Sequence, residues 1–507
     1  MPISAGVWGM WRKVTAMKPT TPPSPQQSSP WPALWAMMLG FFMILVDSTI
    51  VSVAIPAITE DLGASYNEVI WVNSAYLLAY AVPLLITGRL GDRFGPRNIY
   101  ILGLALFTLS SLACGLASTS AALIAARAFQ GLGGAMVTPQ TMSVMIRTFT
   151  PTQRGGAMGV WGATAGLATV MGPLLGGVLV DAGGWPWIFN VNVPIGIIGI
   201  ILALIYVPKL EQTNRTFDWL GVVLSATGMF CLVFGIQEAE HFNWDWRVWA
   251  LLIAAAVLLT LFVQKQRTLG DTALVPLRLF NDRNFTLANV TIATVGFAVS
   301  TYIIPWMIYV QNVQGFTPTQ AALLVLPSGV ISGVLAPIIG RLTNTHDPKP
   351  FAITGLSLAA LSMAISALIT TPEVDSRWMY AIAALYGVAN SMMWGPLSMV
   401  ATRNLERTLA GAGSSVYNTT RQIGAVIGSA AIAAMMTSQL TRTLGGSAGE
   451  TSTTGAAATH MSGTLPPPLH QPFADAMSTS IWLPCAVIAL GALVACCFKR
   501  TESWSAQ

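Results

Sequence analysis

The chain has 507 residues, of which 53% are hydrophobic and only 9% are charged, and its mean hydropathy is +0.62. A soluble domain carries about 25% charged residues, so this composition excludes an ordinary soluble protein and indicates a membrane protein. The net charge of +5 therefore does not indicate nucleic-acid binding, because an excess of Lys and Arg in a membrane protein usually marks its cytoplasmic loops.

Fourteen apolar segments follow one another along the chain, each of about 20 residues and so long enough to cross a bilayer as a helix. They are expected to begin near residues 33, 69, 98, 121, 155, 187, 219, 248, 285, 320, 351, 378, 411 and 478. Residues 1–32 precede them, and their polar, Pro- and Ser-rich character predicts a disordered cytoplasmic tail. The sequence thus predicts an all-α membrane protein.

The basic residues predict which loops are cytoplasmic. If the N-terminus is inside, twenty of the 25 Lys and Arg residues fall in cytoplasmic loops and tails, and three fall outside. The remaining two, Arg127 and Arg421, lie within spans. This bias supports fourteen spans with both termini cytoplasmic, because an even number of spans returns the chain to its starting side.

An internal repeat divides the chain. Three pairs of matching positions share offsets of 252, 257 and 256 residues: Gly88-Arg89-Leu90 with Gly340-Arg341-Leu342, Pro139 with Pro396, and Gly172 with Gly428. Two six-span halves of like topology are therefore expected, and such halves suit a transporter with one site between them. The expected parts are an N-terminal half (33–207), two inserted helices (217–265), a cytoplasmic connection with a short surface helix (266–284), a C-terminal half (285–498) with a flexible extracellular loop (437–477), and a cytoplasmic tail (499–507).

The first span contains an acidic residue, Asp47, some 14 residues from its start, or ~21 Å at a helical rise of ~1.5 Å per residue. An isolated carboxylate at that depth is costly and calls for a partner, a water-filled cavity or a proton. We interpret Asp47 as a residue that takes up and releases a proton as the protein changes shape. The alternative is an Asp that only hydrogen-bonds a neighbouring helix.

Three further motifs combine glycine with charge or proline. The loop Gly88–Arg97 places Asp92 among arginines, where it can accept from one of them or cap the next helix, unless the loop is only a basic cytoplasmic turn. In the fourth span, Arg127 shares a helical stripe with small residues and so points into the bundle, or else snorkels to the surface. In the fifth span, Gly172-Pro173 allows a bend, although the glycines there fit static packing equally well.

These motifs, with the stretches 185–196 and 417–424, resemble the major facilitator superfamily and, more narrowly, the fourteen-span drug:proton antiporter family. The resemblance implies two six-helix halves with two inserted helices, alternating access, and export driven by proton entry. It also implies site roles: proton coupling for Asp47 and Arg127, a cytoplasmic gate for Gly88, Asp92, Arg93, Gly95 and Arg97, and a hinge for Gly172, Pro173, Gly176 and Gly177.

The charge inside the spans departs from what some multidrug members carry. Asp47 is the one acidic residue within any expected span, against two arginines. It must therefore serve both the proton and any cationic substrate, or the substrate is not a cation. Dicationic drugs are doubtful on this basis, whereas neutral, zwitterionic and anionic amphiphiles remain open.

The wall of a substrate cavity is expected from aromatic and polar residues within spans. Arg421 lies about ten residues from either end of its span, too deep for easy snorkelling, so we expect it to face the cavity. For any one aromatic residue, packing in the core or against lipid is the alternative. The candidates are Tyr76, Trp161, Trp306, Trp394, Tyr417, Asn418, Arg421 and Gln422.

The sequence thus favours a proton-coupled secondary exporter of amphipathic small molecules, acting in multidrug efflux from the inner (plasma) membrane. Its expected partners are a small substrate, protons and the lipid bilayer, with no nucleic acid and no cofactor. No Walker A pattern occurs, so no ATP is expected, and four histidines in loops argue against a metal site. The alternatives are a dedicated exporter of an endogenous lipid, siderophore or metabolite, and a non-transporting membrane sensor or enzyme. An enzyme is disfavoured because the spans offer no nucleophile–base pair.

Overall fold

The computed structural model describes residues 29–64, 66–212, 218–239, 242, 244–270, 273–444 and 465–500. Residues 1–28 of the predicted tail, 445–464 of the predicted extracellular loop and 501–507 of the C-terminal tail lie outside the described residues. Within the described ranges all regular elements are helices, which confirms the predicted fold class.

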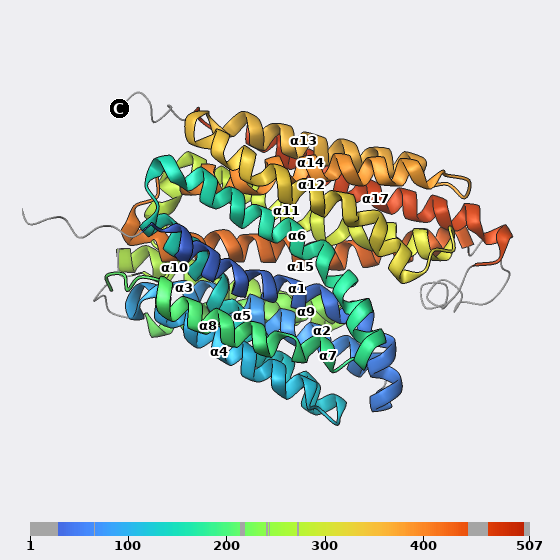
Figure 1. Cartoon of the computed structure of the whole chain (residues 1–507), viewed down its shortest axis with the longest axis horizontal. Coiled ribbons are helices and arrows are strands. Elements are labelled where there is room, and N and C mark those ends of the chain that lie inside the picture. The colour runs from blue at the N-terminus through green and yellow to red at the C-terminus, as the bar shows by residue number, and fades with distance from the viewer. Residues whose placement is uncertain are drawn as a thin grey trace, which may run out of the picture.

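The helices fall into two sets joined by a hairpin (Figure 1). The first set is α1 (Trp31–Leu62), α2 (Tyr66–Ala81), α3 (Leu84–Phe94), α4 (Pro96–Gly115), α5 (Ser120–Thr148), α6 (Pro151–Gly183), α7 (Trp187–Asn190) and α8 (Asn192–Tyr206). The hairpin is α9 (Trp219–Gln237) and α10 (Trp246–Leu269). The second set is α11 (Arg283–Asn312), α12 (Pro318–Thr345), α13 (Pro348–Ile369), α14 (Ser376–Thr402), α15 (Ala410–Leu444) and α17 (Pro467–Cys496), with short 3-10 helices η2 (Leu277–Asn281) and η3 (Arg407–Leu409).

Many acidic residues between the spans cap the helix that follows them. Side-chain oxygens of Asp218, Asp245 and Asp282 accept from backbone N–H groups in the first turns of α9, α10 and α11, at 2.8–2.9 Å. Asp347 and Asp375 do the same for α13 and α14. A carboxylate at a helix N-terminus satisfies free N–H groups and the positive end of the helix dipole. These caps fix where the spans begin.

Proline interrupts two of the expected spans. The second is divided into α2 and α3, which meet at 47° with Pro83 between them. The fifth, α6, bends by 43° between Ala168 and Met171. Proline has no N–H, and its ring clashes with the carbonyl four residues earlier, so Pro173 disturbs α6 at residue 169. Both bends therefore follow from the local sequence.

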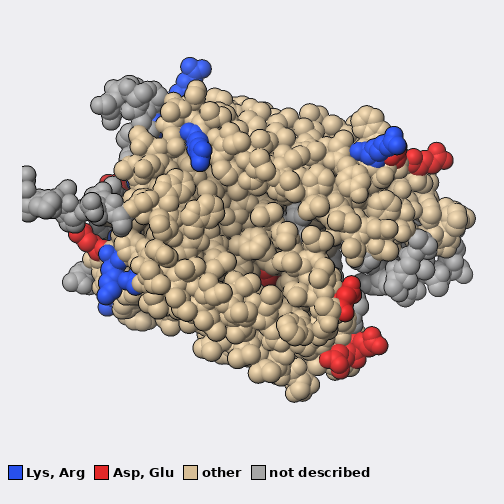
Figure 2. Space-filling view, viewed as in Figure 1, with Lys and Arg blue, Asp and Glu red and all other residues tan. Residues whose placement is uncertain are grey.

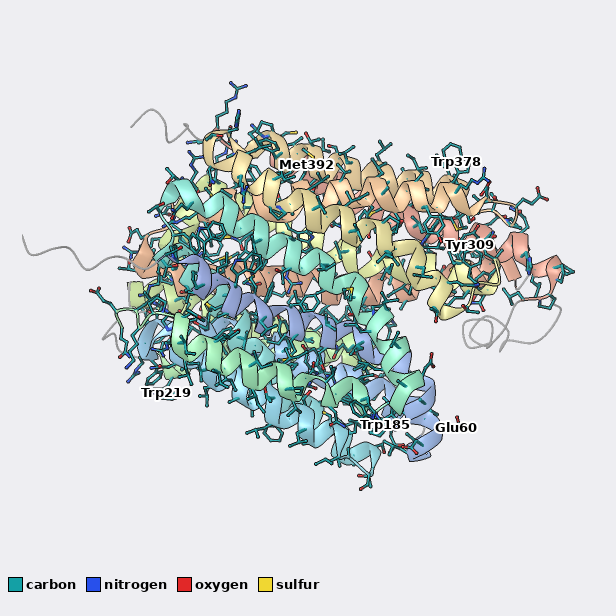
Figure 3. All side chains as sticks on the ribbon, in the orientation of Figure 1. Glu60, Trp185, Trp219, Tyr309, Trp378 and Met392 are labelled. Atoms are coloured by element: carbon teal, nitrogen blue, oxygen red, sulfur yellow. The ribbon has the colours of Figure 1, made fainter. Side chains whose placement is uncertain are left out.

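Eleven helices in the described chain are long and apolar enough to cross a membrane, and each of the two bent pairs adds one more if it forms a single span. These thirteen match expected spans. The one expected span that remains, the twelfth along the chain, is α14. This helix has 27 residues but is not among the helices that meet the criterion of apolarity. The exposed side chains of Trp219 and Trp378, which Figure 3 shows at opposite ends of the bundle, are typical of membrane–water interfaces.

The two halves meet along two seams. In one, α6 packs against α12 and α14, and in the other, α15 packs against α3 and α5. The hairpin covers the second seam, because Met229 and Val233 of α9 form one apolar cluster with residues of α2 and with Val426 of α15. The halves diverge toward one end of the bundle (Figure 1), where the space-filling view shows a notch between them (Figure 2).

The closed and the open end of the bundle differ in charge. Helix α1 begins and α17 ends at the closed end (Figure 1), where Lys and Arg side chains gather (Figure 2), whereas Glu60 lies at the open end (Figure 3). By the positive-inside rule this distribution of charge predicts that the closed end faces the cytoplasm. The bundle is therefore closed at the end where α1 begins and open at the opposite end.

The connection before α11 differs from the surface helix expected at 266–284. Helix α10 continues to Leu269, and only Leu277–Asn281 forms a short 3-10 helix. Leu274, Val275 and Leu279 are buried against Phe262 of α10 and residues of α11 and α15. The expectation of a surface helix was wrong because these apolar side chains have a protein surface to cover, which the sequence of the segment does not reveal.

Candidate functional site

A buried ion pair joins the first span to the fourth. Arg127 Nη1 of α5 lies 2.6 Å from Asp47 Oδ2 of α1, and both side chains are 0% exposed. The two residues that carry the predicted proton site are thus in direct contact. The alternative in which Arg127 snorkels to the surface is wrong, because its guanidinium is bound inside the bundle.

Two amide side chains hold the other oxygen of the carboxylate. Gln130 Nε2 of α5 and Asn192 Nδ2 of α8 each donate to Asp47 Oδ1 at 2.9 Å. Both amides also reach Ser111 Oγ of α4, at 2.9 and 3.0 Å. Asp47 therefore receives three donors from two helices, and none of its surface is open to a ligand. Four spans converge on one carboxylate.

The guanidinium of Arg127 is held on several sides. Its Nε donates to Val72 O of α2 at 3.1 Å, and its Nη1 also donates to Gln130 Oε1 at 2.6 Å. Its carbon lies 4.1 Å from the centre of the Tyr76 ring, a cation–π contact. Among the described residues Nη2 has no hydrogen-bond partner. Tyr76, which was expected in the substrate cavity, lies instead beneath the ion pair.

The α6 bend touches α1 one turn from Asp47. A Cβ added at Gly172 would collide with Thr49 Oγ1 and lie 3.1 Å from Val46 O, so only glycine allows this approach. Pro173 follows at once, and Gly177 faces Thr319 of α12 across the seam. Gly176 is buried on the same segment. The hinge residues expected from the sequence thus lie between the ion pair and the other half.

The cytoplasmic loop motif contacts the other half of the molecule. Asp92 is buried against the first turn of α15, where a Cβ on Gly411 would collide with its carboxylate, but neither carboxylate oxygen makes a hydrogen bond to a described residue. Gly88 lies so close to Ser415 and Gly411 O that a Cβ would collide with both. A carboxylate at a helix N-terminus is favourable, so this contact stabilises the closed cytoplasmic side. The helix that Asp92 approaches is in the C-terminal half and not the next one along the chain.

The arginines of this motif have separate contacts. Arg89 Nη1 lies 3.8 Å from Asp92 Oδ2, and its Nε and Nη2 donate to the carbonyls of Leu274, at 2.9 Å, and Ala273. Arg97 donates to Leu204 O of α8, and Arg93 lies over the Phe94 ring at 5.4 Å. Gly95 has φ +89°, a conformation that favours glycine. Arg89 therefore ties the motif to the buried connection.

The repeat supplies a second contact of the same kind, which the sequence analysis missed. Asn344 Oδ1 of α12 accepts from Gly155 N, the fifth residue of α6, at 2.7 Å. Asn344 lies 252 residues after Asp92, the same offset that relates Gly88 to Gly340. Gly340 itself packs against Gly155 and Gly159. Extending the repeat by four positions would have identified it.

The aromatic candidates for the cavity are dispersed. Trp161 of α6 is buried, stacks on Phe41 at 5.1 Å and donates to Thr141 Oγ1 at 3.3 Å. Trp306 belongs to an aromatic row with Tyr302 and Tyr309 inside the C-terminal half. Trp394 of α14 packs at the seam against Gly162, and its Nε1 donates to Asn390 Oδ1 at 3.2 Å. Trp394 thus lies at the seam between the halves, whereas Trp161 packs inside the N-terminal half and Trp306 inside the C-terminal half.

The polar candidates form a group on α15. Tyr417 and Asn418 are fully buried and Gln422 nearly so, whereas Arg421 is partly exposed. Tyr417 Oη and Asn418 Oδ1 have no hydrogen-bond partner among the described residues. Such unsatisfied atoms are rare in buried positions and are a reason to look for a ligand.

Comparison with known proteins bears on the family and the fold. Residues 37–429 match the family model of the Major Facilitator Superfamily. The chain is 47% identical over 474 residues to the MFS-type transporter Rv1250 of Mycobacterium tuberculosis, covering 93% of this chain and 81% of that protein. It is 33% identical over 427 residues to the tetracenomycin C resistance and export protein of Streptomyces glaucescens, covering 83% and 78%. The fold is similar to that of the proton:xylose symporter XylE, with a TM-score of 0.63 at 12% identity, covering 94% of this chain and 97% of that chain.

Proposed function

The chain belongs to the major facilitator superfamily of membrane transporters, and from this premise we propose that it is a proton-coupled antiporter that exports amphipathic small molecules across the inner membrane by alternating access. The observation that carries the proposal is the buried Asp47–Arg127 pair at 2.6 Å. The names of relatives, among them the tetracenomycin C export protein and a multidrug resistance protein, support export as the direction.

The ion pair makes the protein's conformation sensitive to one proton. With Asp47 ionised, the charges of Asp47 and Arg127 balance each other inside the bundle. A proton on Asp47 removes that balance and leaves the guanidinium buried with only dipoles and the Tyr76 ring. Removing one partner of a buried pair typically costs about 3–5 kcal/mol. Proton uptake therefore favours a different arrangement of these helices, in which Arg127 finds water or another partner.

The contact between α1 and α6 provides a path from the proton site to the gate. Thr49 packs on Gly172 at the α6 bend, and the rest of α6 lies along α12 and α14 of the other half. If α1 shifts after protonation, the contact between Thr49 and Gly172 changes, and the bend of α6 changes with it. A movement of α6 then shifts Gly155, near the start of this helix, away from Asn344 at the closed cytoplasmic end.

The contacts at the closed cytoplasmic end stabilise the outward-open state relative to the inward-open state. Asp92 at the N-terminus of α15 and Asn344 at that of α6 hold the two halves together at equivalent positions. A charge at a helix end contributes about 0.3–1 kcal/mol, and a neutral hydrogen bond about 0.5–1.5 kcal/mol. Both values are small beside the ~3–5 kcal/mol that a broken buried ion pair costs, so protonation of Asp47 is sufficient to break these two contacts.

The proton gradient supplies the driving force in this scheme. Each positive charge that enters contributes about 2.3 kcal/mol per 100 mV of membrane potential, in addition to the pH difference. Because Asp47 is enclosed by protein donors, proton and substrate do not compete for one carboxylate. Coupling is indirect, through the change of conformation.

The test uses purified protein in proteoliposomes with an imposed pH gradient and an enclosed pH-sensitive dye. Addition of a substrate is expected to release protons in the wild type and not in Asp47→Asn. Glu60→Gln is the matched control, since Glu60 is an exposed acid on the same helix. Substrate-dependent proton flux that survives in Asp47→Asn would overturn the assignment of the proton site.

A dedicated exporter of one endogenous compound is a second candidate. The partly exposed Arg421, which has no acidic partner among the described residues, favours a compound with a defined polar group over a purely apolar drug. Deletion of the gene is then expected to cause accumulation of that compound in the cell. Drug sensitivity without accumulation would favour multidrug efflux instead.

A further inference from the structure

The charges in the middle of the membrane do not cancel. Asp47 is neutralised by Arg127 and is fully enclosed, so it is not open to a ligand. Arg421 remains, with no ion pair or hydrogen bond from its side chain to any part of the chain that the structure describes. It lies 11 residues into α15, ~17 Å along the helix at ~1.5 Å per residue, which is near the middle of a hydrocarbon core about 30 Å thick.

The direction of Arg421 follows from its neighbours on α15. Ser414, which donates to Pro139 O of α5, lies about 20° from Arg421 around the helix at ~100° per residue. Gly424, which packs on Ala293 O of α11, lies about 60° away on the other side. Because α5 belongs to one half and α11 to the other, the side chain points between the halves. The opposite face of α15, at Ile423 and Val426, packs toward α9.

Two buried polar groups without partners among the described residues lie beside Arg421 on α15. Tyr417, one turn before it, has a buried hydroxyl without a partner, and Asn418 has a buried carbonyl oxygen without one. The Asn418 amide nitrogen is already used, because it donates to Ser414 O at 2.9 Å. Both groups are fully buried, so the accessible part of the site is the permanent cation of Arg421, with an unpaired hydroxyl and an unpaired carbonyl oxygen packed behind it.

We infer that the exported substrate is an organic anion, an apolar body with a carboxylate, sulfonate or phenolate group that Arg421 binds between the two halves. The inference rests on the proposed export function and names its substrate class. An unpaired cation at this depth is costly, and an anionic ligand removes that cost, whereas a cationic ligand adds to it. A planar guanidinium is also the side chain best suited to hold an anionic oxygen pair.

The experiment compares three amphiphiles with the same aromatic body: 1-pyrenesulfonate, 1-pyrenemethanol and 1-pyrenemethyl-trimethylammonium. Their charges are fixed, so none of them can carry a proton across the membrane by itself. The wild type in proteoliposomes is expected to release protons on addition of the sulfonate, much less with the alcohol, and not with the ammonium compound. Binding is measured in parallel by fluorescence anisotropy of pyrene.

Variants of Arg421 then test the residue itself. Arg421→Gln is expected to raise the KM for the sulfonate about tenfold to hundredfold, which is the usual effect of losing a hydrogen bond to a charged group. Arg421→Lys should recover part of the loss, since lysine keeps the positive charge but cannot bind two oxygens at once as a planar guanidinium does. Arg442→Gln is the matched control, an exposed arginine further along the same helix. Thermal unfolding of each variant shows whether it is folded.

The outcomes separate the substrate class from the transport function. A wild type that moves the alcohol or the ammonium compound as well as the sulfonate overturns the inference and leaves export intact. Sulfonate transport with an unchanged KM in a folded Arg421→Gln also overturns it. A wild type that couples protons to none of the three compounds contradicts the export of aromatic amphiphiles, and the inference falls with it.

Discussion

Removing one charge at a time from the Asp47–Arg127 pair is expected to destabilise the protein, whereas removing both is expected to cost much less. Asp47→Asn leaves Arg127 fully buried with Val72 O and Gln130 Oε1 as its acceptors. Arg127→Gln leaves the carboxylate with two amide donors and no counter-charge. Each single change should cost about 3–5 kcal/mol, because an uncompensated charge remains in a low-dielectric site.

The two single variants should respond differently to pH. An uncompensated carboxylate can escape its cost by taking up a proton, so the instability of Arg127→Gln should lessen as the pH falls. Arginine stays protonated throughout, so the instability of Asp47→Asn should not change in this way. The double variant Asp47→Asn/Arg127→Gln contains no buried charge here and should recover most of the stability of the wild type, while remaining unable to couple protons.

Thermal unfolding in a fixed detergent and lipid mixture, from acidic to neutral pH, measures these effects, and proteoliposome assays measure coupling on the same samples. The four proteins form a double-mutant cycle whose interaction energy should exceed about 2 kcal/mol, within the range for residues in direct contact. Strictly additive losses would contradict a coupled, buried pair. So would an Asp47→Asn protein as stable as the wild type.

Other contacts lead to smaller, separable effects. Gly172→Ala should force α6 away from Thr49, which should lower the stability of the protein by about 1–3 kcal/mol and slow transport. Adding Thr49→Ala should make room for the new methyl group and restore part of the transport rate. Asn344→Ala should favour the inward-open state about twofold to tenfold, read from cysteine labelling at the cytoplasmic end, because it loses the bond to Gly155 N. Arg89→Gln should expose the 273–275 segment to protease, since both carbonyls it holds are released.

The conspicuous part of the site could be predicted from sequence because charge inside an apolar span is rare. Asp47 and Arg127 stand out on that ground, the family resemblance that the comparisons confirm implies a role in proton coupling for each, and the structure places them in contact. Gln130, Asn192 and Ser111 do not stand out, since neutral polar residues are common in spans. Only the folded chain shows that Gln130 and Asn192 donate to one carboxylate and that Ser111 accepts from both amides.

Apolar pattern predicts that a segment is buried but not what it is buried against. The apolar turns of the connection at 266–284 were expected to form a short surface helix. Their partners come from α10, α11 and α15, which are far apart in sequence. The two bends and the loop caps, by contrast, depend on local chemistry at Pro83, Pro173 and the capping acids, and these positions are readable along the chain.

The two halves of the repeat no longer carry equivalent charges. Shifting Asp47 by 252 to 257 residues leads to positions 299–304, which contain no acid, and shifting Arg421 back by 256 leads to Ala165. The proposed proton site thus belongs to one half, while the unpaired cation belongs to the other. If the substrate binds Arg421 and the proton binds Asp47, the variants should separate the two steps: Asp47→Asn should lose proton coupling yet still bind 1-pyrenesulfonate, and Arg421→Gln should bind it weakly yet keep one proton per turnover when saturated. Loss of the same step in both variants would instead indicate one shared site.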